Sequence, residues 1–202
     1  MIVPLISSFL SATEFRSTFS LSLKGGLTNI SEQGMNSDYA LGINHFPVVP
    51  VHDDYSVGLA LTAKLAGNLR LEFDGNYSQA PKKVTLTDPS DHDEIEYKPL
   101  DFADVSLSFM WDLTCKRLQP YIAAGGGMLL VMPSPESETR TKDGYAIIFE
   151  KTPMKTSFFA RSTLGLRIYI FEGLAFRIEG NYFYLPKEKN SMVRLAGGIQ
   201  FF

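Results

Sequence analysis

The sequence predicts an all-β chain that folds as an eight-stranded antiparallel up-and-down transmembrane β-barrel. In several segments apolar residues alternate with small or charged residues, which is the period of a β-strand with two different faces. One hairpin pattern occurs twice within the 202 residues. The connections between segments alternate between long and short, which favours a barrel inserted from one side, because only one end has to cross the bilayer.

A hairpin between residues 55 and 77 organises the rest of the chain. Its apolar residues recur at every second position on both sides of Gly67-Asn68. A Gly-Asn turn between two alternating runs predicts a β-hairpin. The sequence FDGNY at residues 73–77 is echoed by IEGNY at residues 178–182. This repeat indicates a sheet built from one unit used several times.

The same alternation predicts the other strands. Strands are expected at about residues 16–28, 55–66, 69–77, 102–113, 120–132, 155–170, 174–184 and 192–202. Strands of about 10–11 residues match what a tilted strand needs to span hydrocarbon. Long polar connections are expected at about residues 29–54, 80–100 and 133–154. Residues 15–202 are therefore assigned to one outer-membrane β-barrel domain, and residues 1–14 to a leader or residual signal segment.

Composition narrows the class of protein further. Charged residues make up 20% and aromatic residues 12% of the chain, with 16 Gly and 11 Pro, which suits an all-β protein rich in turns. The net charge of −3 gives no electrostatic case for nucleic acid as a partner. The single Cys115 excludes an intramolecular disulfide and cannot build a zinc site. No window approaches the roughly 20 apolar residues of a membrane helix.

A soluble lipocalin-like ligand-binding barrel would also show alternating strands. The two alternatives differ in which face of the strands points into the barrel: the polar face in the membrane barrel and the apolar face in the soluble one. In the soluble barrel Leu59 and Phe73 would point into a ligand cavity, and Arg70 and Arg177 would be solvated. Small residues on the polar face suit a crowded interior, and aromatic residues near strand ends suit membrane interfaces. The expected interfacial aromatics are Tyr55, Tyr77, Trp111, Tyr121, Tyr182 and Tyr184.

Three short motifs resemble one known family. PYIAAGGG at residues 120–127 resembles the PY-hydrophobic-small-small-Gly-x-Gly strand of the OmpA/OmpX/OmpW-like small eight-stranded outer-membrane β-barrels. FSLSLKGG at residues 19–26 looks like the first strand of that family. The chain ends in GGIQFF, and the resemblance implies that Phe201 and Phe202 form the insertion signal, with Phe201 on the lipid side by alternation. It also implies a monomer in the lipid bilayer of the bacterial outer membrane, with both termini periplasmic.

The polar faces of the expected strands carry charges of both signs. An eight-stranded barrel has an interior just wide enough for side chains to fill, and buried charges there must be paired. Glu72 and Glu179 occupy near-equivalent places in the repeated hairpin, so each is expected to anchor basic residues. The predicted interior charges are Lys24, Lys64, Arg70, Glu72, Asp74, Asp104, Asp112, Arg161, Arg167, Arg177, Glu179 and Arg194. Such a network predicts a plugged barrel.

The long loops carry the other candidate residues. His45, His52 and His92 lie beside acidic residues, but the chain has no G-x-S-x-G elbow, so no catalysis is expected. The acidic run from residue 88 to 96 lacks the spacing of an EF-hand, and neither a metal nor a cofactor is predicted. The expected function is a structural, adhesive or surface-recognition role, with a host or surface ligand at the loops. The alternative is a narrow conduit for small hydrophobic solutes, which resemblance to OmpW-like members would imply.

Overall fold

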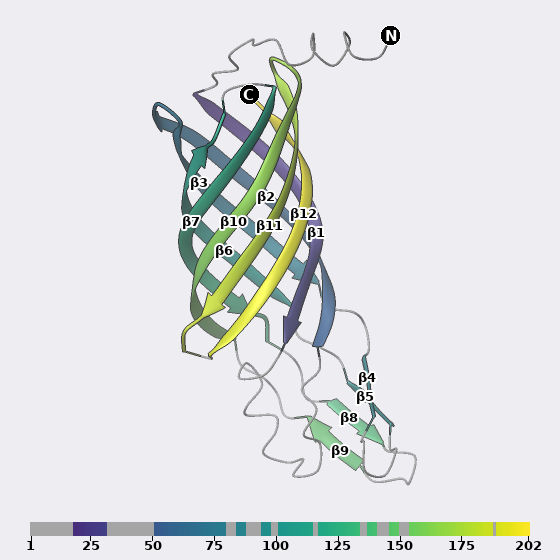
Figure 1. The fold of residues 1–202 in the computed structure, drawn as a ribbon. Helices are drawn as coiled ribbons and strands as arrows, with labels where there is room; N and C mark the ends of the chain where they lie inside the picture. The colour runs from purple at the N-terminus through teal and green to yellow at the C-terminus, as the bar shows by residue number, and fades with distance from the viewer. Residues whose placement is uncertain are drawn as a thin grey trace.

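In the computed structural model the chain forms a closed β-barrel with short hairpins near one end (Figure 1). The structure describes residues 18–31, 51–79, 84–87, 94–97, 101–114, 117–133, 137–140, 146–149, 154–187 and 189–202. The expected leader at residues 1–14 lies outside these residues, as do His45 and His92. Within the described residues, no helix is long and apolar enough to cross a membrane.

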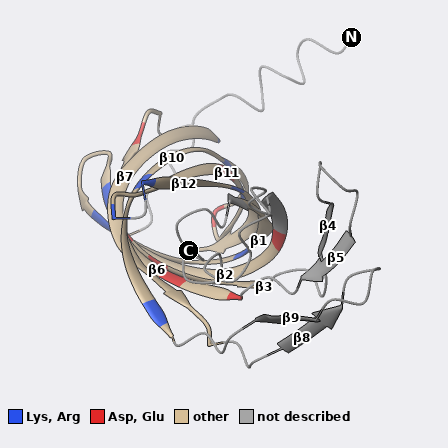
Figure 2. Cartoon of the chain, turned by 90° about the horizontal axis from the view of Figure 1, so that it is seen from below, with Lys and Arg blue, Asp and Glu red and all other residues tan. Residues whose placement is uncertain are grey.

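Eight of the described strands close the barrel. They are β1 (Phe19–Ser31), β2 (Val51–Ala66), β3 (Leu69–Gln79), β6 (Phe102–Asp112), β7 (Leu118–Val131), β10 (Lys155–Phe171), β11 (Leu174–Leu185) and β12 (Asn190–Phe201). The ring runs β1-β12-β11-β10-β7-β6-β3-β2, and antiparallel pairing of β2 with β1 closes it. Successive barrel strands are neighbours in this ring, so the predicted up-and-down barrel is confirmed. Figure 2 looks along the barrel axis and shows the ring.

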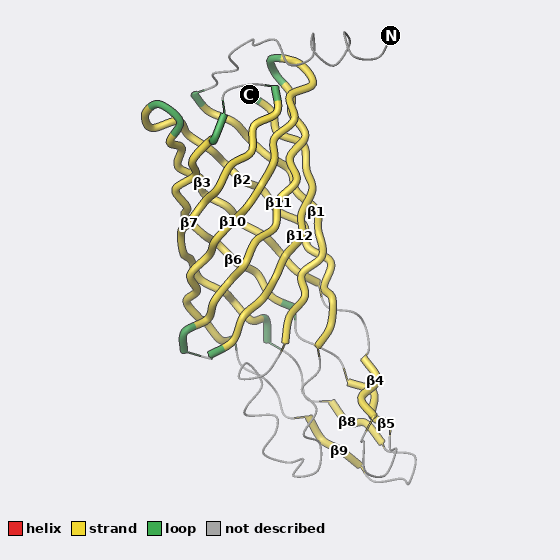
Figure 3. The backbone as a smooth tube through the Cα atoms, viewed as in Figure 1, coloured by secondary structure: helices red, strands yellow, loops and turns green. Residues whose placement is uncertain are grey.

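The two ends of the barrel differ. One end, called the turn end, carries the Gly67-Asn68 and Glu172-Gly173 turns, the start of β1 and the end of β12 (Figure 3). The predicted turn is present, and Gly67 has a φ of +53°, a left-handed conformation that glycine adopts readily in a hairpin turn. The opposite end, called the loop end, receives the connections that follow β1, β3 and β7 (Figure 1).

Short hairpins occupy parts of the loop-end connections that the sequence predicted as loops. In one, β4 (Val84–Thr87) pairs with β5 (Glu94–Tyr97), and in the other, β8 (Ser137–Arg140) pairs with β9 (Ala146–Phe149). The two hairpins touch where β5 meets β8. The sequence indicated a strand beyond the sheet only at residues 145–149, which overlaps β9. Strands of four residues are otherwise too short for alternation to separate them from a polar loop.

The first long connection is shorter than expected. β1 continues to Ser31 and β2 begins at Val51, and these two residues form the last pair of the β1–β2 ladder. The sequence ended both strands where apolar alternation stopped, near Thr28 and Tyr55. The ladder continues beyond that point because hydrogen bonding between strands does not require apolar side chains. As a result Asp54 is a buried residue of β2, paired in register with Thr28.

The faces of the barrel are those of a membrane protein. Leu59 and Phe73 are each 52% exposed, while Arg70 and Arg177 are 3% and 1% exposed. A soluble lipocalin-like barrel needs the opposite arrangement, so that alternative is wrong. The apolar side chains on the outer face suit contact with lipid. The closed ring leaves no strand edge unpaired, which a membrane-spanning sheet requires.

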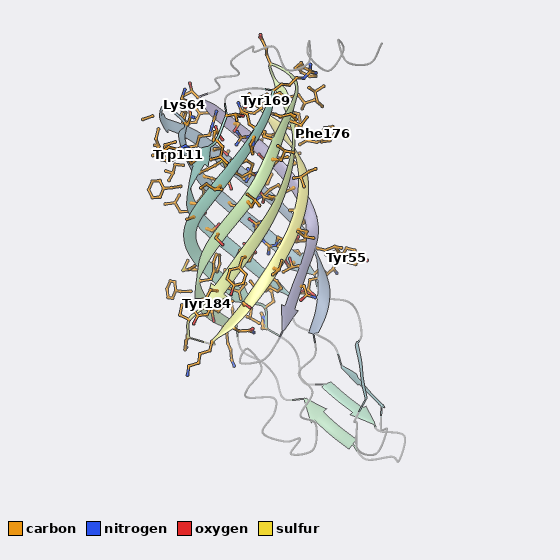
Figure 4. All side chains as sticks on the ribbon, viewed as in Figure 1. Tyr55, Lys64, Trp111, Tyr169, Phe176 and Tyr184 are labelled. Atoms are coloured by element: carbon orange, nitrogen blue, oxygen red, sulfur yellow. The ribbon has the colours of Figure 1, made fainter. Side chains whose placement is uncertain are left out.

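Aromatic side chains project outward near both ends. Figure 4 places Trp111 and Phe176 toward the turn end and Tyr55 and Tyr184 toward the loop end, consistent with interfacial girdles. Tyr77 and Tyr182 are also exposed. The prediction for Tyr121 is wrong, since this residue is fully buried inside the barrel. The error arose because β7 carries small residues on both faces, so its alternation does not reveal which face is lipid-facing.

The lipid-facing register can be tested at Leu107, at the middle of β6 and 49% exposed. We expect Leu107→Arg to lower the free energy of unfolding of the barrel in vesicles by about 2–4 kcal/mol, because it places a charge near the bilayer midplane. Leu65→Arg, close to the turn that follows β2, is the matched control and should cost about 0–1 kcal/mol. Equal costs at the two positions, measured by refolding in urea, would show that the depth or the register is wrong.

Candidate functional site in the barrel interior

Charged side chains reach the barrel interior from opposite walls. Among the described strands, β10, β11 and β12 contribute most of the buried arginines, and β3 and β6 most of the buried carboxylates. These two groups of strands lie across the ring from each other. The buried charged residues are Lys24, Asp54, Arg70, Glu72, Asp74, Asp104, Asp112, Arg161, Arg167, Arg177, Glu179 and Arg194.

Glu72 and Glu179 meet at the centre of the barrel. They belong to β3 and β11, which lie diametrically opposite in the ring, and Arg177 bridges their carboxylates. Both Arg177 Nη atoms donate to Glu72, with Nη2 2.9 Å from Oε1. Arg177 Nη2 also lies 2.5 Å from Glu179 Oε2. Each glutamate therefore binds basic side chains, as the repeated hairpin suggested, and the two share Arg177.

Asp74, Lys24 and Arg161 extend this central network. Lys24 Nζ lies 2.6 Å from Asp74 Oδ2 and 3.0 Å from Glu179 Oε1. Arg161 Nη1 donates to the same Asp74 oxygen at 2.5 Å, and Arg161 Nε donates to Asn181 Oδ1 at 3.0 Å. Among the described residues, the centre thus balances Lys24, Arg161 and Arg177 against Glu72, Asp74 and Glu179. Charge balance matters here because an uncompensated charge in a low-dielectric interior is costly.

Tyr121 packs beside the central network. Its hydroxyl donates to Glu179 Oε2 at 2.9 Å and accepts from Arg177 Nε at 2.7 Å. The guanidinium carbons of Arg167 and Arg177 lie 5.1 and 5.2 Å from its ring centroid. Gly165 on β10 is its cross-strand neighbour, and a Cβ at that position would lie 2.1 Å from Tyr121 Cζ. The glycine leaves the space that the tyrosine ring occupies.

A second group of polar side chains lies toward the turn end. Asp112 accepts from Arg70 Nε at 2.7 Å and from Arg167 Nη1 at 3.0 Å. Arg167 also donates to Gln200 Oε1 at 2.7 Å and to Gln119 Oε1 at 2.9 Å. The amides satisfy guanidinium protons that the lone carboxylate cannot reach, which lets two arginines share Asp112.

Toward the loop end, Arg194 of β12 reaches Asp104 of β6 across the ring, with Nη2 2.5 Å from Oδ2. Arg194 Nε donates to Thr28 Oγ1 at 2.8 Å, and the guanidinium carbon lies 5.0 Å from the Phe183 ring centroid. Apolar side chains fill the adjacent space inside the barrel. They are Phe102, Leu129, Val131, Phe159, Phe183, Leu185 and Met192. The described interior is therefore filled by ion pairs and by an apolar cluster.

The structure buries every predicted interior charge except Lys64. Lys64 is half-buried near the turn end (Figure 4). Sequence reasoning missed Tyr121, Gln119 and Gln200, because uncharged polar residues carried no expectation of pairing. It also missed the asparagines of the repeated motif, whose equivalent places were a usable signal. Asn76 donates to Asp104 at 3.1 Å and Asn181 accepts from Arg161.

The last two residues separate at the turn end. Phe201 is exposed on the lipid face, as alternation predicts. The Phe202 ring stacks on Tyr169 with centroids 4.9 Å apart. Their role as an insertion signal stays a prediction. Among the described residues, no group of His, Cys, Asp and Glu side chains is arranged to hold a metal ion.

A closed ring with an apolar outside and a packed, charged inside defines a small transmembrane β-barrel. Its solved neighbours are outer-membrane barrels of the OmpA/OmpX/OmpW-like fold that the sequence motifs resemble. Neisserial surface protein A aligns with a TM-score of 0.59 and 13% identity over 92% of this chain and 97% of its own. Ail of Yersinia pestis aligns with a TM-score of 0.51 and 8% identity, covering 91% and 96%.

OprG from Pseudomonas aeruginosa aligns with a TM-score of 0.51 and 12% identity over 94% of this chain and 99% of its own. At these identities the likeness establishes the fold alone. Neither a protein-family model nor a curated protein sequence matches the chain.

The central network can be tested at Glu72. We expect Glu72→Ala to lower the free energy of unfolding by about 3–5 kcal/mol, because it leaves Arg177 buried without one of its two carboxylate partners. Glu172→Ala, in the exposed turn between β10 and β11, is the matched control and should change little. Urea unfolding in vesicles measures both variants.

A double variant separates lost pairing from lost packing at the same site. Glu72→Gln combined with Arg177→Met removes both charges and keeps similar volumes, so it should recover most of the stability lost in Glu72→Ala. A double variant that is no more stable than Glu72→Ala would contradict the electrostatic interpretation.

The close approach of Gly165 to Tyr121 gives an independent prediction. Gly165→Ala should destabilise the barrel by about 1–3 kcal/mol, because its Cβ overlaps the tyrosine ring that the central network holds in place. Gly197→Ala is the control, since its Cβ would meet its nearest atom at 3.9 Å. If both variants unfold at the same urea concentration, the tyrosine is not held rigidly.

Proposed function

We propose that the protein is a bacterial outer-membrane barrel with both termini in the periplasm, and that its loop end serves surface recognition or adhesion without catalysis. The observation that carries the proposal is the filled interior. Ion pairs span the ring at Glu72–Arg177 and Asp104–Arg194, and an apolar cluster packs beside them. Side chains that cross the described interior oppose the passage of a solute, which favours the outer surfaces as the place of function.

The loop end supports the recognition role. The hairpins β4–β5 and β8–β9 lie beyond that end of the barrel, and the opposite end has tight turns (Figure 1). A barrel inserted from one side keeps its short turns on the side of entry and its long connections outside. Loops held by a rigid scaffold commonly carry binding residues. A host or surface ligand is therefore expected at the loop end of a monomeric barrel.

The neighbour from Yersinia pestis is named an attachment invasion locus protein. Its example indicates that a barrel of this size and fold is compatible with surface attachment. The identity of 8% makes this a comparison of scaffolds, and the argument for this chain depends on its own closed interior and loop-end hairpins.

A conduit for small hydrophobic solutes is the second candidate. The observation in its favour is the apolar lining near the loop end, which includes Phe102, Phe159 and Met192. In the structure these side chains pack against one another, with the Phe159 and Phe183 rings 5.1 Å apart. A solute would have to displace them and would then meet the ion pairs of Arg161 and Arg194. Surface recognition by a closed barrel is therefore better supported than the conduit.

Intact cells that express the protein test orientation and recognition together. Trypsin added outside should cleave at Lys142 and spare Lys116-Arg117. Binding of these cells to immobilised host surfaces should fall when residues 84–97 or 137–149 are replaced by Gly-Ser linkers. The barrel of each variant should still migrate faster unboiled than boiled on a gel, which shows that it folds. Unchanged binding by both folded variants would overturn the recognition role.

Planar-bilayer recording tests the second candidate. The wild-type protein should give no large, steady conductance. A fluorescent hydrophobic solute should enter vesicles that contain the protein no faster than vesicles without it. Solute transport that disappears in a Phe159→Trp variant, which fills the apolar cluster further, would favour the conduit.

A further inference from the structure

The ladder between β1 and β12, called the seam, differs from the other strand pairs of the barrel. The other neighbouring strands are each joined by a turn or a longer connection, whereas β1 and β12 become neighbours only when the ring closes. The seam runs from the pair Leu21–Phe201 to the pair Ile30–Met192. Because the chain between these two strands is the rest of the barrel, the seam depends on the contacts that cross it.

Glycines face one another in the middle of the seam. Gly25 pairs in register with Gly197, and a second glycine follows each of them in the sequence. In the middle of the β3–β6 ladder, by contrast, Phe73 pairs with Leu107. Contacts between facing side chains stabilise a sheet, and glycine has no side chain to contribute. The centre of the seam is therefore poor in the contacts that stabilise other ladders.

Side chains inside the barrel connect β1 with β12 near both ends of the seam. Gln200 Nε2 donates to Ser20 Oγ at 2.6 Å near the turn end. Arg194 Nε donates to Thr28 Oγ1 at 2.8 Å near the loop end. In both hydrogen bonds the acceptor on β1 is a neutral hydroxyl, so neither bond is an ion pair.

Lys24 provides the connection at the centre. It is the one charged residue in the sequence of β1. Its Nζ donates to Glu179 Oε1 on β11 at 3.0 Å and to Asp74 Oδ2 on β3 at 2.6 Å. Lys24 therefore joins β1 to the strand beyond β12 on one side and to the strand beyond β2 on the other. Hydrogen bonds between charged groups are stronger than those between neutral groups.

We propose that the barrel opens locally at the seam, and that Lys24 is the latch that keeps the seam closed. In the open state β1 separates from β12 near their glycines, while the other ladders stay paired. Unpaired backbone groups are costly in lipid, so the open state is a minor one.

The central network allows this opening. Lys24 loses Glu179 when the seam opens, but Asp74 lies on the same side of the seam and remains within its reach. Glu179 keeps Arg177, whose Nη2 lies 2.5 Å from Glu179 Oε2. Neither the lysine nor the glutamate is left without a partner of opposite charge, which would be the costly outcome.

Amide hydrogen exchange resolved by residue tests the wild-type protein, folded in neutral detergent micelles. Amides that donate across the centre of the seam should exchange faster than amides that donate across the centre of the β3–β6 ladder, because a local opening exposes the former alone. Equal or slower exchange at the seam would overturn the proposal.

Lys24→Met tests the latch, since it removes the charge and keeps an unbranched side chain. Exchange across the seam should become about ten-fold faster, because the loss of a hydrogen bond between charged groups shifts an opening equilibrium by at least this factor. Arg70→Met is the matched control. It removes a buried charge that pairs with Asp112 between β3 and β6 at 2.7 Å, and it should leave the seam unchanged. An equal increase at the seam in both variants, or none in Lys24→Met, would show that Lys24 is not the latch.

A disulfide across the seam separates opening from a general loss of packing. In a Cys115→Ser background, Gly25→Cys and Gly197→Cys place a thiol on each strand at positions where a Cβ meets its nearest atom at 3.8 and 3.9 Å. Facing residues of an antiparallel ladder are close enough for a disulfide. When this bond is formed in Lys24→Met, exchange at the seam should return to the wild-type rate, and reduction should make it fast again.

The control disulfide joins Gly75→Cys to Val105→Cys, which pair in register between β3 and β6. It should leave exchange at the seam of Lys24→Met fast. If this control also slows exchange at the seam, or if the seam disulfide does not, the barrel does not open at the seam.

Discussion

Every buried charge of the barrel has to find its partner within a closed ring. Arg177 and Arg194 are almost fully buried, and the cost of leaving a buried charge unpaired exceeds that of most single substitutions. The long side chains of Arg177 and Arg194 meet this requirement by crossing the ring to Glu72 and Asp104. Gly165 leaves the space for the Tyr121 ring, which packs beside the Arg177 guanidinium.

Pairing and closure are therefore coupled. Among the described strands, Arg161, Arg167, Arg177 and Arg194 lie on β10, β11 and β12, whereas Glu72, Asp74, Asp104 and Asp112 lie on β3 and β6. Neither half of the ring can neutralise its own interior. Arg177–Glu179 and Arg70–Asp112 pair within one group of strands, but Arg177–Glu72 and Arg194–Asp104 form across the closed ring. These cross-ring pairs favour the closed barrel over open sheets that would expose backbone edges to lipid.

The fold could be predicted from the sequence because lipid outside and charge inside impose opposite preferences on successive residues. β2 and β3 follow this rule and were located well. β7 does not, since its glycines and alanines suit both faces, and the direction of Tyr121 could not be read from it. The pairing of charges was predictable in kind, but not in detail, because ring position decides which partner an arginine reaches. Asn76 and Asn181 could have been found from the repeated motif.

A filled interior also changes where function can reside. Ion pairs connect opposite walls of the barrel, so the proposed function is assigned to the loop end, outside this network. Most described residues at the loop end obey local rules of strand and turn. Lys189 breaks one, since a lysine stands in a left-handed position that glycine or asparagine would fill at lower cost. Departures from local preference are expected at functional sites, which makes the β11–β12 turn more informative than the well-paired core.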